Sequence, residues 1–66
     1  MQFTDCGERI KQVQRQKNVA TAFLATELGV SRHQIYRWRE MQDIKVHTVF
    51  KLCQAMGITI QDFFEE

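Results

Sequence analysis

Apolar residues recur three and four positions apart along this chain, in short stretches separated by turn-forming residues. This spacing is typical of amphipathic helices, and the strict apolar–polar alternation of a β-strand is absent from the sequence. The pattern therefore predicts an all-α fold, a compact bundle of five helices in a single domain over residues 1–66. The helices are expected at about 6–17, 21–28, 32–40, 46–56 and 60–64.

Capping signals mark the ends of the first and last of these helices. Asp5 can cap the first helix, and Glu8 follows three residues later, as a capping box requires. Asn18 suits the C-terminal position, because Asn tolerates the left-handed backbone conformation better than most side chains. Thr59 is the expected N-terminal cap of the last helix.

Very few residues separate the second and third helices. Gly29 ends the second helix, and Ser31 with Gln34 forms a capping box that starts the third helix at Arg32. Two helices joined by so tight a turn are the arrangement of a helix-turn-helix, which is expected here at about residues 21–40.

The apolar positions on one side of each helix form the expected core. Ile58 and Phe63, near the end of the chain, are expected to cover this core over the first and fourth helices. The other expected core residues are Cys6, Ile10, Val13, Leu24, Ala25, Leu28, Val30, Ile35, Trp38, Val46, Val49, Phe50, Cys53 and Met56.

The third helix has two different faces, because successive residues of a helix point about 100° apart. Ile35 and Trp38 fall on one side and are expected to face the core. The opposite side and the first turn carry polar and aromatic residues, namely Arg32, His33, Tyr36 and Arg37.

These side-chain types suit the edges of base pairs. Arg can bond in bidentate fashion to guanine, and His or Gln can donate or accept in the major groove. The alternative is that the arginines only solubilise an exposed helix. The tight turn before the helix favours base contact by Arg32, His33 and Arg37, whereas Trp38 is interpreted as a core residue.

Charge is distributed unevenly along the chain, although the net charge is only +1. Residues 9–39 contain seven Lys or Arg and one acid, whereas the rest of the chain contains two Lys and seven acids. Such a chain can present one electropositive surface, which suits a polyanion as partner. The alternative is a set of solvated helix faces with no particular partner.

The segment FLATELGVSRHQIYRW resembles the helix-turn-helix of the Cro/repressor (XRE-like) family. The resemblance rests on a Leu-Ala pair, then Gly-Val-Ser, then Ile four residues after the Ser, here at positions 24–25, 29–31 and 35. GERIKQVQRQKN is similar to the first helix of the family, and TVFKLCQAMGITIQDFF to its fourth helix and closing segment. The resemblance covers residues 7–64.

This resemblance implies a lambda-repressor-like DNA-binding domain that represses transcription, commonly as a dimer on a palindromic operator. The positions that it assigns to base contact are Ser31, Arg32, His33, Gln34, Tyr36 and Arg37. Those that it assigns to the phosphate backbone are Thr21, at the start of the second helix, and Lys45 in the connection before the fourth helix. We add Arg39 as a candidate phosphate contact, although the family pattern does not assign it.

Three departures from the family pattern affect these assignments. The family often has Glu at position 39, paired with an Arg of the first helix, but this chain has Arg39 and Gln14 at the two places. Arg39 must therefore find another carboxylate, solvent or a phosphate. The connection before the fourth helix is one residue short and lacks Pro, which leaves the path around Lys45 open. Phe23 replaces a commonly polar residue, either as core or as an exposed protein contact.

A single recognition helix reads only a few base pairs, whereas a two-fold dimer places two such helices about 34 Å apart in successive major grooves. The end of the chain is unusually apolar for its position. We therefore expect a homodimer, at least on DNA, with Phe63 and Phe64 as candidate contacts. The alternative for Phe63 is the core position given above.

Other chemistries find little support in the sequence. Cys6 and Cys53 are interpreted as reduced thiols of a cytoplasmic protein, and with His33 and His47 they lack zinc-ligand spacing, so no metal or cofactor is expected. No apolar run approaches the roughly 20 residues that span a bilayer, and no signal peptide is evident. A Gly-rich phosphate loop and catalytic pairs are also absent, which argues against an enzyme.

The sequence thus predicts a sequence-specific regulator that binds double-stranded DNA in the major groove. We expect a phage or bacterial repressor that blocks transcription at its operator without a small-molecule ligand. The alternative is a helical adaptor or antitoxin-like protein whose main surface, built from Phe23 and the C-terminal aromatic residues, binds another protein.

Overall fold

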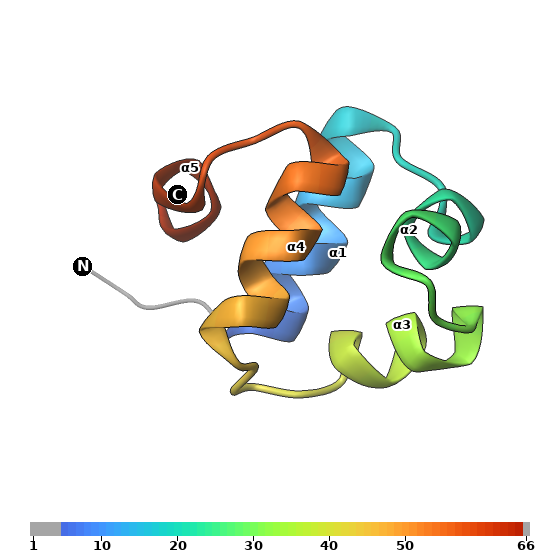
Figure 1. The fold of residues 1–66 in the computed structure, drawn as a ribbon. Coiled ribbons are helices and arrows are strands. Elements are labelled where there is room, and N and C mark those ends of the chain that lie inside the picture. Colours follow the sequence, from blue (N-terminus) through green and yellow to red (C-terminus); the bar gives the residue numbers. More distant parts are fainter. Residues whose placement is uncertain (1–4, 66) are drawn as a thin grey trace.

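The computed structural model describes residues 5–65, and these residues form five α-helices (Figure 1). They are α1 (Cys6–Lys17), α2 (Thr21–Leu28), α3 (Arg32–Arg39), α4 (Val46–Met56) and α5 (Ile60–Phe64). The predicted all-α fold is confirmed, and the helix bounds agree with the prediction except that α3 ends one residue earlier. Glu40 is the C-cap of α3 and is not its last residue.

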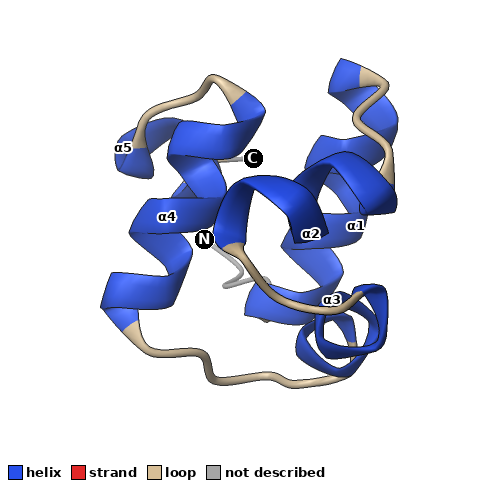
Figure 2. Ribbon diagram, turned by 45° about the vertical axis from the view of Figure 1, so that its right-hand side comes forward, coloured by secondary structure: helices blue, strands red, loops and turns tan. Residues whose placement is uncertain are grey.

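The helices α1 and α4 lie side by side in the middle of the molecule, and the other helices pack around this pair (Figures 1 and 2). α2 and α3 lie on one side, where α2 contacts both α3 and α4, and α3 also contacts α1. α5 lies on the other side and contacts both central helices. The helix-turn-helix is therefore supported from behind by the two longest helices.

Local hydrogen bonds explain where α1 and α5 begin. The Asp5 carboxylate accepts a 2.7 Å hydrogen bond from the backbone N–H of Glu8, and Asn18 ends α1 in the left-handed conformation at φ 56°. Thr59 forms a complete capping box with Asp62, in which each side chain accepts from the backbone N–H of the other residue. The predicted caps of both helices are confirmed.

The core lies between α1, α2, α3 and α4 and is closed at one end by α5. Val30, Trp38, Leu28 and Ile58 are partly buried against it. Its fully or nearly fully buried apolar residues are Cys6, Ile10, Val13, Leu24, Ala25, Ile35, Val49, Leu52, Cys53, Met56 and Phe63. Most of the predicted core is confirmed.

Two core predictions on α4 were wrong. Val46 is 72% exposed and Phe50 is 48% exposed, whereas Leu52, which was not predicted, is fully buried. The buried stripe of α4 runs through Val49, Leu52, Cys53 and Met56. Val46 and Phe50 lie about 70° and 110° around the helix from the middle of that stripe. Apolar spacing alone could not tell the middle of the stripe from its edge.

Arg9 lies inside the protein, although it belongs to the basic segment of the sequence. It is only 8% exposed, and its guanidinium donates hydrogen bonds to the backbone carbonyls of Asp62, Phe63 and Glu65, at 2.8 Å to the first and 2.6 Å to the last. These carbonyls belong to the C-terminal end of α5, where helical carbonyls lack partners within the helix and favour a positive charge. Arg9 therefore fastens α5 to α1 and is not available to DNA.

The start of α1 lies directly against the connection between α3 and α4. The backbone N–H of Cys6 donates to the carbonyl of Gln42 at 3.0 Å, and that of Gly7 donates to the carbonyl of Met41 at 2.9 Å. A Cβ atom on Gly7 would lie 2.5 Å from the Met41 carbonyl oxygen and closer still to that of Arg39. The lack of a side chain at Gly7 therefore permits this contact.

We predict that Gly7→Ala lowers the free energy of unfolding by about 1–3 kcal/mol, because the added methyl group must displace backbone atoms. The effect should exceed the gain of about 1 kcal/mol that Ala normally brings over Gly inside a helix. Urea unfolding followed by circular dichroism measures the change, with Gln16→Ala, at an exposed position of α1, as the control. A Gly7→Ala protein as stable as the wild type would contradict the close approach of Gly7 to the carbonyls of Arg39 and Met41.

Both cysteines are free and buried in the core. Burial, the larger cause, and the negative charge of Asp62 together raise the pKa of the Cys53 thiol from 9.0 to about 11. Burial also raises the pKa of Cys6, partly opposed by a hydrogen bond from the backbone of Ile44. In the native protein both thiols are therefore poor nucleophiles at neutral pH.

The shifted pKa of Cys53 predicts a loss of stability in alkali. Between pH about 9 and about 11 the unfolded chain loses the thiol proton that the native protein keeps, so ionisation favours unfolding as the pH rises. We expect the free energy of unfolding, measured in urea, to fall more between pH about 8 and about 10 in the wild type than in Cys53→Ala. An equal fall in the free energy of unfolding of the two proteins would show that Cys53 has the same pKa in the native and the unfolded protein.

Candidate nucleic-acid interface

A three-residue turn joins α2 to α3. Gly29 ends α2 at φ 70°, a left-handed conformation that glycine adopts without strain. Val30 bonds back to α2, from its N–H to the carbonyl of Ala25 at 3.0 Å. The Ser31 hydroxyl then accepts a 3.2 Å hydrogen bond from the backbone N–H of Gln34 and caps α3. The predicted start of the third helix is confirmed.

Burial of one side of α3 sets the direction of the other side. Ile35 is fully buried, and Trp38, one turn later, is half-buried against the core. Both core predictions are confirmed, Trp38 as a partly buried residue. α3 lies along the lower face of the molecule in Figure 1, with its first turn at the end that adjoins α2.

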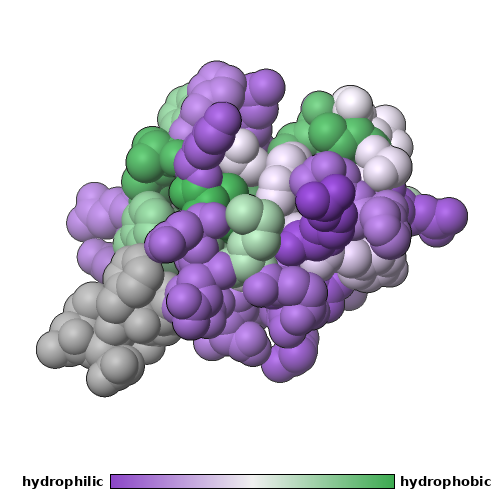
Figure 3. Space-filling model, turned by 90° about the horizontal axis from the view of Figure 1, so that it is seen from below, coloured by the Kyte–Doolittle hydropathy of each residue, from purple (hydrophilic) through white to green (hydrophobic). Residues whose placement is uncertain are grey.

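Most of the predicted base-contact residues lie on the accessible side of α3. Gln34 is half-buried and so is less accessible than the other predicted base-contact residues. Tyr36 is 51% exposed. From below, the molecular surface is mainly hydrophilic, and the hydrophobic residues form two separate groups with hydrophilic residues between them (Figure 3). The exposed members of the predicted set are Ser31, Arg32, His33, Tyr36 and Arg37.

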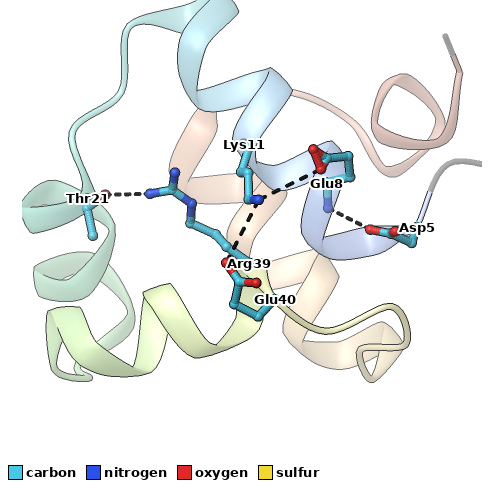
Figure 4. Close-up of polar contacts among 6 residues, drawn as sticks. All are labelled: Asp5, Glu8, Lys11, Thr21, Arg39 and Glu40. Atoms are coloured by element: carbon cyan, nitrogen blue, oxygen red, sulfur yellow. Dashed lines mark hydrogen bonds and ion pairs between the residues drawn. The ribbon is translucent and has the colours of Figure 1, made fainter.

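The hydroxyl of Thr21 lies where α1, α2 and α3 meet. Its Oγ1 atom accepts a 3.2 Å hydrogen bond from Nε2 of Gln14. It also accepts a 3.4 Å hydrogen bond from Nη1 of Arg39, which Figure 4 shows. A hydroxyl has two lone pairs and one proton, so these two donors leave the proton of Thr21 to be donated elsewhere. Thr21 is the first residue of α2, and the N-cap Ala20 has no side chain to bond the helix N–H groups. This corner of the molecule can therefore accept an anion.

Among residues 5–65, no carboxylate forms an ion pair with Arg39. Besides its bond to Thr21, its guanidinium carbon lies 5.4 Å from the centroid of the Tyr36 ring, within the range of a cation–π contact. Gln14 is buried and also donates to the carbonyl of Val19 at 3.1 Å. A hydroxyl-centred cluster therefore stands where the family often has an ion pair. Gln14 and Arg39, which replace the ion pair often found in the family, were the sequence signal for this cluster. They did not indicate that Thr21 or Tyr36 takes part in it.

Lys45 lies far along the chain from the turn between α2 and α3. It is exposed and is the N-cap of α4, at the end of the connection that follows α3. In Figure 1 this connection leaves the C-terminal end of α3 along the same lower face. The candidate phosphate contacts Thr21 and Lys45 therefore belong to two different elements, the start of α2 and the start of α4.

The positive surface is smaller than the sequence suggested. Arg9 is buried, and the ammonium group of Lys11 lies 3.8 Å from the carboxylate of Glu8 and 3.9 Å from that of Glu40 (Figure 4). These ion pairs are exposed and contribute little stability, but they offset the charge of Lys11. The cations that remain exposed on α3 are Arg32 and Arg37.

The structure corrects the expected dimer contact at Phe63. This side chain is fully buried, so it belongs to the core and offers no surface to a second chain. Phe64 is half-buried, with its ring edge-to-face against Phe63 at a centroid distance of 5.0 Å. Phe23 is 48% exposed on α2, which decides between its two alternatives in favour of an exposed position.

Neither a metal-ion site nor a membrane-spanning helix is found in residues 5–65. Within residues 5–65, no three or more His, Cys, Asp or Glu side chains come together in a way that could hold a metal ion. None of the helices described is long and apolar enough to cross a membrane.

A tight turn, an anchored third helix and an accessible polar face together define a helix-turn-helix protein. The family model described as the Cro/C1-type HTH DNA-binding domain matches residues 9–65, and the chain belongs to this family. Members of the family are DNA-binding regulators and are generally not enzymes. Searches of curated proteins and of solved structures found no match. The family resemblance seen in the sequence is confirmed.

We predict that Thr21→Val weakens DNA binding about fivefold, as expected for one lost hydrogen bond of about 1 kcal/mol. Valine keeps the shape of threonine and removes the hydroxyl. This loss should appear on specific and random duplexes alike, because a phosphate contact carries no sequence information. Any further loss on the specific duplex reports on the bond between Thr21 and Arg39. Thr26→Val, at an exposed position of the same helix, is the matched control. A loss confined to one sequence, or no loss at all, would contradict a phosphate contact.

Proposed function

We propose that this protein is a sequence-specific transcriptional repressor that binds an operator in double-stranded DNA and blocks access of RNA polymerase. The observation that carries the proposal is the division of α3 into a buried side and an exposed side. Ile35 and Trp38 hold the helix on the core, and polar side chains project away directly after the turn. Membership of the Cro/C1-type family supports the same function.

In this proposal α3 enters the major groove with its first turn leading. Arg32 and His33, at the start of the helix, read base edges, and Arg37 reads another base pair one turn later. Tyr36 lies between these positions and can contact a thymine methyl group through its ring. Ser31 contacts DNA at the helix start, and the half-buried Gln34 reaches a base or the backbone.

In the same proposal, residues outside α3 hold the phosphate backbone at two places. The hydroxyl of Thr21 and the free N–H groups of α2 bind one phosphate, supported by the charge of Arg39, and Lys45 binds another. These contacts contribute affinity that depends on salt, whereas the residues of α3 contribute the choice of sequence.

We propose further that the protein binds a palindromic operator as a homodimer in the cytoplasm of a bacterium, either as a chromosomal or as a phage protein. α5 lies on the side of the molecule away from α2 and α3 (Figure 1). A two-fold contact through α5, with Phe64 as a contributing side chain, would leave both recognition helices free. Two such helices about 34 Å apart would read enough base pairs to select a site.

Selection of bound duplexes from a random pool, followed by sedimentation of the protein with and without the selected duplex, tests this function. The expected result is an enriched palindrome that binds two chains. An enriched site without two-fold symmetry would contradict the dimer alone. No enrichment at moderate salt would contradict the regulator and favour a protein-binding adaptor, for which the exposed Phe23 is the candidate contact.

We predict that Arg37→Ala weakens binding to the selected duplex by about 1–3 kcal/mol and relaxes the preference at one base pair. Arg37 is exposed on α3, so the substitution should leave the fold unchanged. Arg15→Ala, which removes an exposed charge from α1, is the control for the general effect of charge. An equal loss on selected and random duplexes would show that Arg37 does not read a base.

A further inference from the structure

Arg39 connects two residues that have different tasks in the proposed function. Its Nη1 atom donates to the hydroxyl of Thr21, and its guanidinium lies over the ring of Tyr36. Thr21 stands at the start of α2 and is a candidate phosphate contact, whereas Tyr36 stands on the accessible side of α3 and is a candidate base contact. One side chain therefore spans the phosphate-binding corner and the base-reading helix.

The chemistry of the guanidinium suits this double contact. Arg39 follows Tyr36 by three positions, a spacing that places two side chains next to each other on a helix. The guanidinium is flat, so its faces can stack on a ring while the N–H groups at its edge donate hydrogen bonds. A lysine ammonium is a compact point charge and lacks both the flat face and the fixed fork of donors. The contact therefore depends on arginine and not on positive charge alone.

Gln14 holds the other side of this cluster in place. Its amide nitrogen donates to both Thr21 and the carbonyl of Val19, so the hydroxyl of Thr21 is bonded from two directions. Gln14 is more than nine-tenths buried, and its Oε1 atom has no hydrogen-bond partner among the described residues. Because a buried amide held in this way cannot easily turn, it restricts where the hydroxyl of Thr21, and through it Arg39, can lie.

Tyr36 needs such support, because its ring is half exposed. An exposed aromatic side chain exchanges between rotamers unless a neighbour favours one of them. In the free protein, before DNA is bound, Arg39 is the neighbour that favours one rotamer of Tyr36. A ring that is already placed requires less ordering when the protein meets a base pair, which improves discrimination at that position.

We propose that Arg39 is a positioning residue that fixes the Tyr36 ring on the DNA-facing side of α3 and couples it to the phosphate contact at Thr21. The inference rests on the proposed function, because it assumes that Tyr36 faces DNA. It differs from a direct phosphate contact by Arg39, which would add affinity equally for every sequence.

The first test uses the free protein and does not depend on DNA. The side-chain protons of Arg39 lie over an aromatic ring, so their nuclear magnetic resonance signals should be shifted upfield in the wild type. The shift should disappear in Tyr36→Leu, and Tyr36 is exposed, so this variant is expected to fold. An Arg39 signal that is the same in both proteins would overturn the proposal.

The second test compares binding to the selected duplex and to its variants at each base pair. Arg39→Lys keeps the charge, so affinity for random duplexes should stay within about twofold of the wild type. Preference at a single base pair should fall about two- to fivefold, the value of one exposed cation–π contact. That base pair should be the one whose preference is lost in Tyr36→Ala. Arg15→Lys, the same change at an exposed position of α1, is the matched control.

The double variant separates positioning from direct contact. In the Tyr36→Ala background, Arg39→Lys should cause no further loss of preference, because the ring that it positions is gone. Additive effects, or a uniform loss on all duplexes, would overturn the positioning role. A wild-type protein that enriches no sequence would instead contradict the proposed function, while the resonance measurement would still decide whether Arg39 holds Tyr36.

Discussion

The burial of Ile35 is the contact on which the accessible surface of α3 depends. Side chains on an α-helix have fixed directions relative to one another, so one fully buried residue sets the rotation of this eight-residue helix about its axis. Trp38 adds a second point of attachment along the same side. Arg32, His33 and Arg37 then face outward together as a consequence of this apolar packing.

α1 provides the frame that keeps this helix in position. At its start, Gly7 lets the backbone that follows α3 approach within hydrogen-bond distance, and Arg9 binds the last carbonyls of α5. Near its end, Gln14 reaches Thr21 and so joins the first turn of α2. One helix, α1, thus contacts the start of α2, the connection after α3 and α5.

Positive residues that look alike in the sequence have different tasks in the structure. Arg9 is buried as a ligand of backbone carbonyls, Lys11 pairs with two carboxylates, and Arg39 stacks on a ring and bonds a hydroxyl. Charge counting over residues 9–39 treated them alike, as candidates for one electropositive surface or for separate solvated helix faces. The distinction depends on partners as far as 56 residues away in the chain, which no local pattern can indicate.

The sequence by itself determined the helices, their ends and the family, because capping bonds and apolar periodicity act over three or four residues. It also determined that Ile35 and Trp38 turn inward and that the opposite side of α3 is polar. Only the tertiary structure decided that Val46 and Phe50 lie outside the core, that Phe63 lies inside it, and that Arg39 joins Thr21 to Tyr36. In each case the outcome depends on which element covers a given side of a helix, and that is a property of packing between distant segments.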